Sequence, residues 1–120
     1  MSFREAFPIL SVDDVDRAVD FYTSVFGFEK TFWFDQDGST AYAYLELEPL
    51  GIGLARRSDD APEFALWIYA DDVDAAAEAL RAAGADEVAA PADQEWGERL
   101  CTFRTADGHL VHVGSAPAES

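Results

Sequence analysis

The chain has 120 residues, of which 49% are hydrophobic and 27% charged, a composition ordinary for a folded globular protein of one domain. Its 24 Asp and Glu residues against 8 Lys and Arg give a net charge of −16, which repels nucleic acid and anionic membrane surfaces and attracts cations. These numbers exclude wholesale disorder and low-complexity classes, and we expect no nucleic-acid or membrane partner.

The N-terminus has no signal-peptide pattern, and no apolar run approaches the about 18–20 residues needed to cross a bilayer. A single cysteine, Cys101, cannot form an intramolecular disulfide, and its neighbours in a strand-like segment indicate a buried thiol. We therefore expect a soluble, cytoplasmic protein.

The chain contains an internal repeat. SVDDVDRAVDFYTSVFGFE, residues 11–29, is echoed by YADDVDAAAEALRAAGADE, residues 69–87, a spacing close to half the chain. An alternating apolar run precedes each copy, and three short strand-like segments separated by turn residues follow it. Each half therefore predicts a strand, a helix and three strands (βαβββ). The three following strands are expected at 29–34, 40–47 and 51–56 in the first half, and at 86–89, 100–104 and 110–113 in the second.

Each repeat predicts one amphipathic helix with matching start and stop signals. Asp13 or Asp14, and Asp71 or Asp72, can accept hydrogen bonds from the free amides of the first turn. Glycines at 27 and 84 can adopt the left-handed conformation that ends a helix. Apolar residues at i, i+3 and i+4 spacing predict the core stripe of the first helix, which comprises Val15, Ala18, Val19, Tyr22 and Phe26.

The doubled βαβββ unit, with DxxRAVDFYxxVFGFE early and FRTADGHLVHV late, resembles the vicinal-oxygen-chelate superfamily, which includes glyoxalases, extradiol dioxygenases and bleomycin-resistance proteins. The resemblance implies an α+β protein of two tandem βαβββ modules whose mixed sheets form a cup, completed in a homodimer. We expect one such domain over residues 1–120. Its parts are module one at about 5–57, a linker at 58–62, module two at about 63–114 and a C-terminal tail at 115–120.

Enzymes of this superfamily hold a divalent metal through His, Glu or Gln side chains on the first and last strand of each module. The corresponding positions here are Phe7, Gly53, Ala65 and His112, of which only His112 can coordinate. We therefore expect no metal, no other cofactor and no catalytic residue. A shifted set that recruits glutamates would restore a metal-dependent glyoxalase or dioxygenase activity, which is the alternative.

Aromatic residues are dense in the expected strands. Alternation along a strand places Ala65, Trp67 and Tyr69 on one face, with Leu66 and Ile68 toward the helix. Trp96 stands in a polar loop with no obvious core to join. Trp67, Tyr69 and Trp96, with His112, predict a platform for a flat aromatic or cationic ligand. The further members of the platform are Phe32, Trp33, Phe34, Tyr42 and Tyr44.

Within the superfamily, FPILSVDDV, ALWIYADD and DQEWGER most resemble bleomycin-resistance proteins, which bind the drug without altering it. The resemblance implies that Phe34, Trp67 and Trp96 stack on the ligand, with Asp35, Asp37 and Glu98 as nearby anions. We expect a non-catalytic protein that sequesters a cationic or aromatic, bleomycin-like antibiotic and confers resistance to it. The third alternative is a scaffold or regulatory module that uses only its dimer surface.

Overall fold

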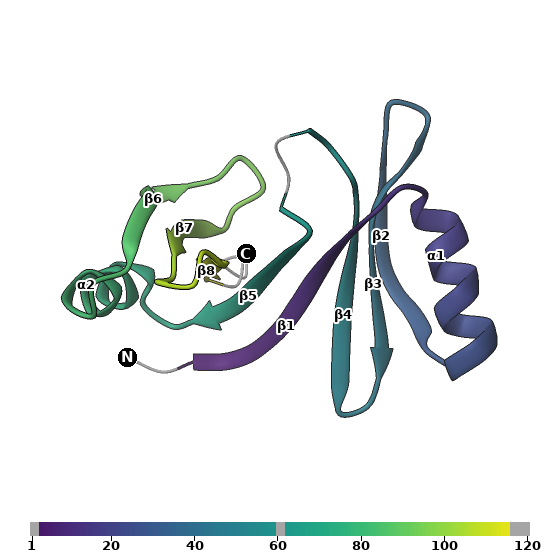
Figure 1. Cartoon of the computed structure of the whole chain (residues 1–120), viewed down its shortest axis with the longest axis horizontal. Coiled ribbons are helices and arrows are strands. Elements are labelled where there is room, and N and C mark those ends of the chain that lie inside the picture. Colours follow the sequence, from purple (N-terminus) through teal and green to yellow (C-terminus); the bar gives the residue numbers. More distant parts are fainter. Residues whose placement is uncertain (1–2, 60–61, 116–120) are drawn as a thin grey trace. The chain divides into compact units, whose positions relative to one another are not determined.

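The computed structural model describes residues 3–59 and 62–115, and its elements follow the βαβββ order twice (Figure 1). Module one consists of β1 (Phe3–Val12), α1 (Val15–Phe21), the π-helical turn η1 (Tyr22–Phe26), β2 (Glu29–Gln36), β3 (Ser39–Leu47) and β4 (Leu50–Arg56). Module two consists of β5 (Phe64–Ala70), α2 (Val73–Ala82), β6 (Asp86–Asp93), β7 (Arg99–Arg104) and β8 (Leu110–Gly114). The predicted α+β class and the tandem modules are confirmed. Part of the expected linker, 60–61, and most of the expected tail, 116–120, lie outside the described residues.

Each module builds its own mixed sheet with the same topology. In module one the strand order is β2-β3-β4-β1, and β1 runs parallel to β4 while the other pairs are antiparallel. In module two the order is β6-β7-β8-β5, and β5 runs parallel to β8. The contacts group the chain into two compact units, one of residues 7–64 and the other of the start of β1 with the chain from Ala65 onward.

The two helices begin in the same way. Asp14 and Asp72 both have extended backbone, and each accepts a hydrogen bond through a carboxylate oxygen from the amide three residues later, at 3.1 and 3.0 Å. The second Asp of each DDVD block is therefore the cap, which decides between the two alternatives that the sequence leaves open. Gly27 and Gly84 have φ angles of 83° and 88°, as expected for residues that end a helix.

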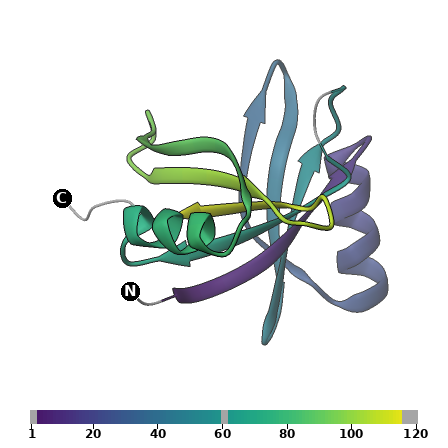
Figure 2. The same ribbon diagram turned by 60° about the vertical axis from the view of Figure 1, so that its left-hand side comes forward.

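Each helix covers one face of the sheet in its own module. In module one, α1 lies against β3 and β4 (Figure 1), and Val15 and Val19 pack there with buried residues such as Leu45 and Leu54. In module two, α2 covers β7 and β8 (Figure 2), with Phe103 and Cys101 fully buried beneath it. Burial also raises the pKa of the Cys101 thiol, in agreement with the expected buried cysteine.

The end of the first helix differs from the sequence-based expectation. The wider π-helical turn from Tyr22 to Phe26 changes the phase of the helix, so Phe26 leaves the predicted core stripe and is 53% exposed. Its ring instead makes an edge contact with Phe21, at 5.7 Å between centroids. Phe28, after the helix, packs against the core of module one.

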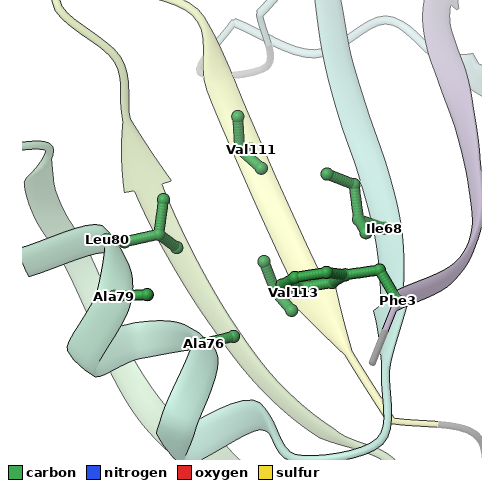
Figure 3. A pocket seen from close by; sticks show the side chains of 7 residues that line it. All are labelled: Phe3, Ile68, Ala76, Ala79, Leu80, Val111 and Val113. Carbon is green, nitrogen blue, oxygen red and sulfur yellow. The ribbon is translucent and has the colours of Figure 1, made fainter. Parts of the chain in front are cut away.

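A small apolar pocket of about 200 Å³ lies between α2 and the sheet of module two (Figure 3). Phe3, from the start of β1, and Ile68, from β5, line it opposite Ala76 and Leu80 of α2. This placement confirms that Ile68 is on the helix side of β5. Among the described residues, neither helix is long and apolar enough to cross a membrane.

Candidate ligand-binding faces

The face of module one that is turned away from α1 carries a cluster of aromatic rings. Phe32 and Phe34 on β2 stand opposite Tyr44 and Tyr42 on β3, so that all four side chains are on one side of the sheet. The rings of Phe34 and Tyr42 stack at 5.7 Å between centroids with 25° between their planes, and Phe32 lies 6.2 Å from Phe34. Phe32 is 54% exposed and Phe34 is 49% exposed, so much of this aromatic surface faces solvent.

Two glycines of β4 give the tyrosines of this cluster room to lie flat on the sheet. A Cβ at Gly51 would overlap the phenol of Tyr44, and a Cβ at Gly53 would lie 2.5 Å from the Tyr42 hydroxyl oxygen. The Tyr44 ring is also fixed from the side by an edge contact with the buried Phe7, at 4.9 Å between centroids. The two tyrosine rings are therefore packed closely onto β4, beside the more exposed rings of Phe32 and Phe34.

Trp33 and Asp35 are placed differently from the other predicted site residues on β2. Trp33 pairs with Ala43, whose side chain belongs to the core beneath α1, so the indole is on the opposite face from Phe32 and Phe34. The ammonium of Lys30 lies over the Trp33 ring in a cation–π contact, 4.2 Å from the ring centroid. Asp35 is exposed at the end of β2, beside the turn to β3. Strand alternation, applied to β2, is enough to separate Trp33 from its neighbours.

The corresponding face of module two is built around Trp67. Trp67 on β5, His112 on β8 and Thr102 on β7 form one row across the three strands. The Trp67 and His112 rings lie 5.7 Å apart, and His112 Nδ1 is 2.8 Å from the Thr102 hydroxyl. Burial lowers the pKa of His112 from 6.5, which favours the neutral imidazole. Tyr69, two residues along β5, makes an edge contact with Trp67 at 5.9 Å, as strand alternation predicts.

The loop between β6 and β7 adds a carboxylate to this face. Glu98 is only 8% exposed, and one of its oxygens, Oε1, accepts a hydrogen bond from the indole of Trp96. The Tyr69 hydroxyl lies close to Glu98, and its pKa is raised to about 12, chiefly by burial and then by the negative charge of that carboxylate. Trp96 itself is 57% exposed, so its ring remains available to stack on another molecule.

The residues at the superfamily's metal positions do not fit a divalent ion. Phe7 and Ala65 are buried side chains made only of carbon and hydrogen, Gly53 has no side chain, and His112 alone offers a donor atom. Across the described residues, no group of three or more His, Cys, Asp or Glu side chains is arranged to hold a metal. The donor set at these positions therefore gives no basis for chemistry at a bound metal.

The paired arginines at the end of β4 are occupied by partners in the compact unit of residues 7–64. The Arg57 guanidinium contacts Asp13 at 2.9 Å and also pairs with Glu63. Arg56 donates to the carbonyl of Gln36, at 3.3 Å, and to the hydroxyl of Ser39. These contacts hold both cations at the strand ends, and carboxylates offset the charge of Arg57.

The fold is shared with several solved structures. A glyoxalase/bleomycin resistance protein/dioxygenase superfamily member from Vibrio splendidus 12B01 aligns with a TM-score of 0.76 and 17% identity, covering 96% of this chain and 100% of that chain. Hypothetical protein BH1468 from Bacillus halodurans C-125 aligns with a TM-score of 0.77 and 15% identity, covering 100% and 99%. Methylmalonyl-CoA epimerase from Streptomyces coelicolor, as a variant in complex with 2-nitronate-propionyl-CoA, aligns with a TM-score of 0.75 and 20% identity, covering 98% and 100%. At these identities the likeness defines the fold alone.

The sequence itself defines the family. Residues 6–113 match the profile of the Glyoxalase/Bleomycin resistance protein/Dioxygenase superfamily, and the chain belongs to this superfamily. No curated protein matches the chain. Membership includes both enzymes and binding proteins, so function has to be argued from the two faces described above.

Proposed function

We propose that this protein binds a flat aromatic, positively charged small molecule and holds it without altering it. The observation that carries the proposal is the exposed aromatic cluster of module one, in which Phe34 and Tyr42 are already stacked and Phe32 stands beside them. Contiguous exposed rings of this kind are uncommon on a soluble protein unless they meet a ligand or a partner. A bleomycin-like antibiotic, sequestered to give resistance, is the specific ligand that we propose.

Charge supports a cationic ligand over a neutral one. The net charge of −16 attracts cations over the range of a Debye length, about 10 Å at 0.1 M salt, and raises their rate of encounter. Aromatic faces also attract cations directly through their ring quadrupoles. Binding should therefore weaken as salt is added, and mainly through a slower association rate.

The absence of a fitting donor set favours binding over catalysis. Only one of the four superfamily metal positions, His112, carries a side chain that can coordinate an ion. The partly buried imidazole, favoured in its neutral form and placed beside Trp67, is suited to a hydrogen bond with a ligand group. We assign His112 to ligand contact in this proposal, and we keep the expected homodimer as part of it.

The test is a titration of the purified protein with bleomycin, followed by tryptophan fluorescence. We expect saturable quenching with one drug molecule per subunit, weakened by salt. Phe34→Ala should weaken binding at least tenfold, equivalent to about 1.4 kcal/mol, because it removes a ring of the aromatic cluster that carries the proposal. Trp67→Ala and Trp96→Ala test the face of module two in the same way.

Trp33→Ala is the matched control, because it removes an equally large and half-exposed indole from the opposite face of β2. Its affinity should stay within twofold of the wild type. Unchanged affinity in Phe34→Ala would contradict a ligand site on the aromatic cluster of module one, and unchanged affinity in both Trp67→Ala and Trp96→Ala would exclude the face of module two. Size-exclusion chromatography with light scattering on the same variants separates a lost ligand contact from a lost dimer.

A further inference from the structure

Strand β2 has one edge without a partner strand in the part of the chain that the structure describes. It is the outermost strand of module one, and its ladder partner is β3. Seven of its eight residues are exposed, and the strand contains no proline. The amides and carbonyls along a free strand edge are ready to pair with another strand, and proteins usually protect such an edge. The free edge of β2 is therefore a candidate interaction surface.

The outermost strand of module two, β6, is protected in a way that β2 is not. Pro91 lies within β6, and a proline has no amide with which to join another strand. Three of the eight residues of β6 are alanines, which offer little area to bury. In β2 the side chains of Phe32, Trp33 and Phe34 are each about half exposed. β2 therefore has both the free edge and the apolar surface that association with another strand requires.

The two faces of β2 are complementary to those of a second β2. Phe32 and Phe34 are on one face of the strand, and Trp33 is on the other. If two copies run antiparallel about a twofold axis at Trp33, each Phe32 stands opposite the partner's Phe34, and the two Trp33 side chains stand opposite each other. A shift of one residue would place phenylalanines opposite Trp33, on the wrong face. A shift of two residues would leave rings opposite polar side chains. The sequence of β2 thus favours one register of self-pairing.

The charged residues of β2 favour the same arrangement. Lys30 pairs with Leu45, whose side chain is in the core beneath α1, so the lysine is on the helix side of the strand. Asp35 pairs with Thr40, whose hydroxyl donates to Asp16 of α1, so this carboxylate is on the helix side as well. Antiparallel pairing of two β2 strands brings each lysine beside the partner's aspartate. One complementary ion pair therefore forms at each end of the paired strands.

We propose that β2 pairs antiparallel, about Trp33, with β2 of a second copy of this chain, and that the two aromatic clusters thereby join into one ligand-binding surface. This inference rests on the proposed function and specifies where the expected homodimer meets the site. The new strand pair satisfies backbone groups along both edges and buries ring surface on both faces. Each copy contributes Phe32 and Phe34 to the shared surface. Such a surface suits an extended ligand with several flat rings, longer than one cluster can cover.

The net charge gives this association a distinctive salt dependence. Two chains of −16 repel each other over a Debye length, about 10 Å at 0.1 M salt, and added salt screens that repulsion. The two local ion pairs act only at contact and do not offset the repulsion at longer range. We therefore expect the ligand-free dimer to become tighter as salt is added, whereas binding of a cationic ligand becomes weaker. Sedimentation equilibrium without ligand measures the first effect separately.

A cysteine at the proposed axis is the direct test. Trp33→Cys places two thiols opposite each other only if the strands pair about this residue, and mild oxidation should then give a covalent dimer on a non-reducing gel. The native Cys101 is fully buried and does not compete. Val88→Cys on β6 is the matched control, because Val88 is 53% exposed and Trp33 is 52% exposed. Cross-linking that fails in Trp33→Cys, or that is as fast in Val88→Cys, would overturn the proposal.

Charge reversal tests the register independently. Lys30→Glu places a carboxylate beside the partner's Asp35 at both ends, and it should weaken the dimer about fivefold in sedimentation equilibrium. Combining Lys30→Glu with Asp35→Lys restores opposite charges and should restore the dimer. The double variant still lacks the cation over Trp33, so its recovery cannot come from that contact. A double variant as weak as Lys30→Glu alone would contradict this register.

The same measurements separate this inference from the proposed function. If Trp33→Cys cross-links but neither it nor the wild type binds bleomycin, the pairing stands and the ligand is not this drug. If bleomycin quenches the fluorescence of a protein that stays monomeric in light scattering, single chains bind the drug and the pairing is wrong. A dimer that gives no cross-link at position 33 associates through another surface, which also overturns the pairing. Melting temperatures of the variants show that each is folded.

Discussion

Asp14 and Asp72 cap their helices with nearly identical geometry, whereas the sheet faces turned away from those helices carry different side chains. In module one, Ile9 on β1 pairs with Gly53 on β4, and in module two the matching pair is Trp67 with His112. The helix-covered halves share what folding needs, namely a cap, an apolar stripe and a covered sheet face. The opposite faces differ between the modules, and this is where the candidate ligand contacts lie.

On both faces an aromatic ring packs over a glycine, but the ring comes from a different strand in each module. In module one the rings of Tyr42 and Tyr44 come from β3 and lie over glycines of β4. In module two the Trp67 ring comes from β5 and lies against Gly114 of β8, where an added Cβ would stand 3.0 Å from Trp67 Cζ2. The same packing device therefore produces two differently shaped aromatic surfaces.

The largest effect should come from filling the space at Gly51. Gly51→Ala forces the Tyr44 ring off β4, and we expect a loss of about 1–3 kcal/mol in unfolding free energy, measured with urea. Gly114→Ala should cost less, because Trp67 has to move by only a few tenths of an ångström. Tyr44→Ala combined with Gly51→Ala should recover part of the loss, and strictly additive costs would contradict the close packing of the two residues.

Loss of a helix cap should lower the unfolding free energy less than Gly51→Ala does, and by the same amount in either module. We expect Asp14→Ala and Asp72→Ala each to lower the unfolding free energy by about 1 kcal/mol, because each leaves one first-turn amide without its acceptor. Replacement by Asn retains an oxygen acceptor and should cost only a few tenths of that. A cost restricted to one helix would show that the two caps are not equivalent.

The smallest effect should be a pH dependence that belongs to module two alone. Burial lowers the pKa of His112 below 6.5, so the unfolded chain binds a proton at His112 more readily than the folded one. The stability that neutral His112 contributes is therefore present above pH 6.5 and declines as the pH falls below it. His112→Asn should flatten this part of the pH profile measured with urea, and an NMR pKa at or above 6.5 would argue against burial of the imidazole.

Much of the fold could be predicted from the sequence because the same βαβββ pattern occurs twice in it. The DDVD blocks and the strand alternation placed both helices and the Trp67–Tyr69 face correctly. Alternation also separates Trp33 from its neighbours, but reading 31–34 as one aromatic block conceals this. The displacement of Phe26 follows from a π-helical turn, for which a periodic pattern of apolar residues gives no signal.

The state of Glu98 could not have been predicted at all from its surroundings in the sequence. It lies in a polar loop among charged and turn-forming residues, where an acidic side chain is normally solvated. Its burial depends on contacts with Trp96, close by in the sequence, and with Tyr69, which is far away in it. The resemblance to drug-binding relatives pointed to an anion here, but only the folded chain shows that this anion is buried.

The single cysteine of the chain can serve as an intrinsic probe of how often module two opens. Cys101 is fully buried on β7, and its raised pKa keeps it in the unreactive thiol form. A thiol reagent can therefore modify it only when the strands beneath α2 separate, so the labelling rate measures how often that opening occurs. Slower labelling in the presence of a ligand would report occupancy of module two without any added dye or engineered residue.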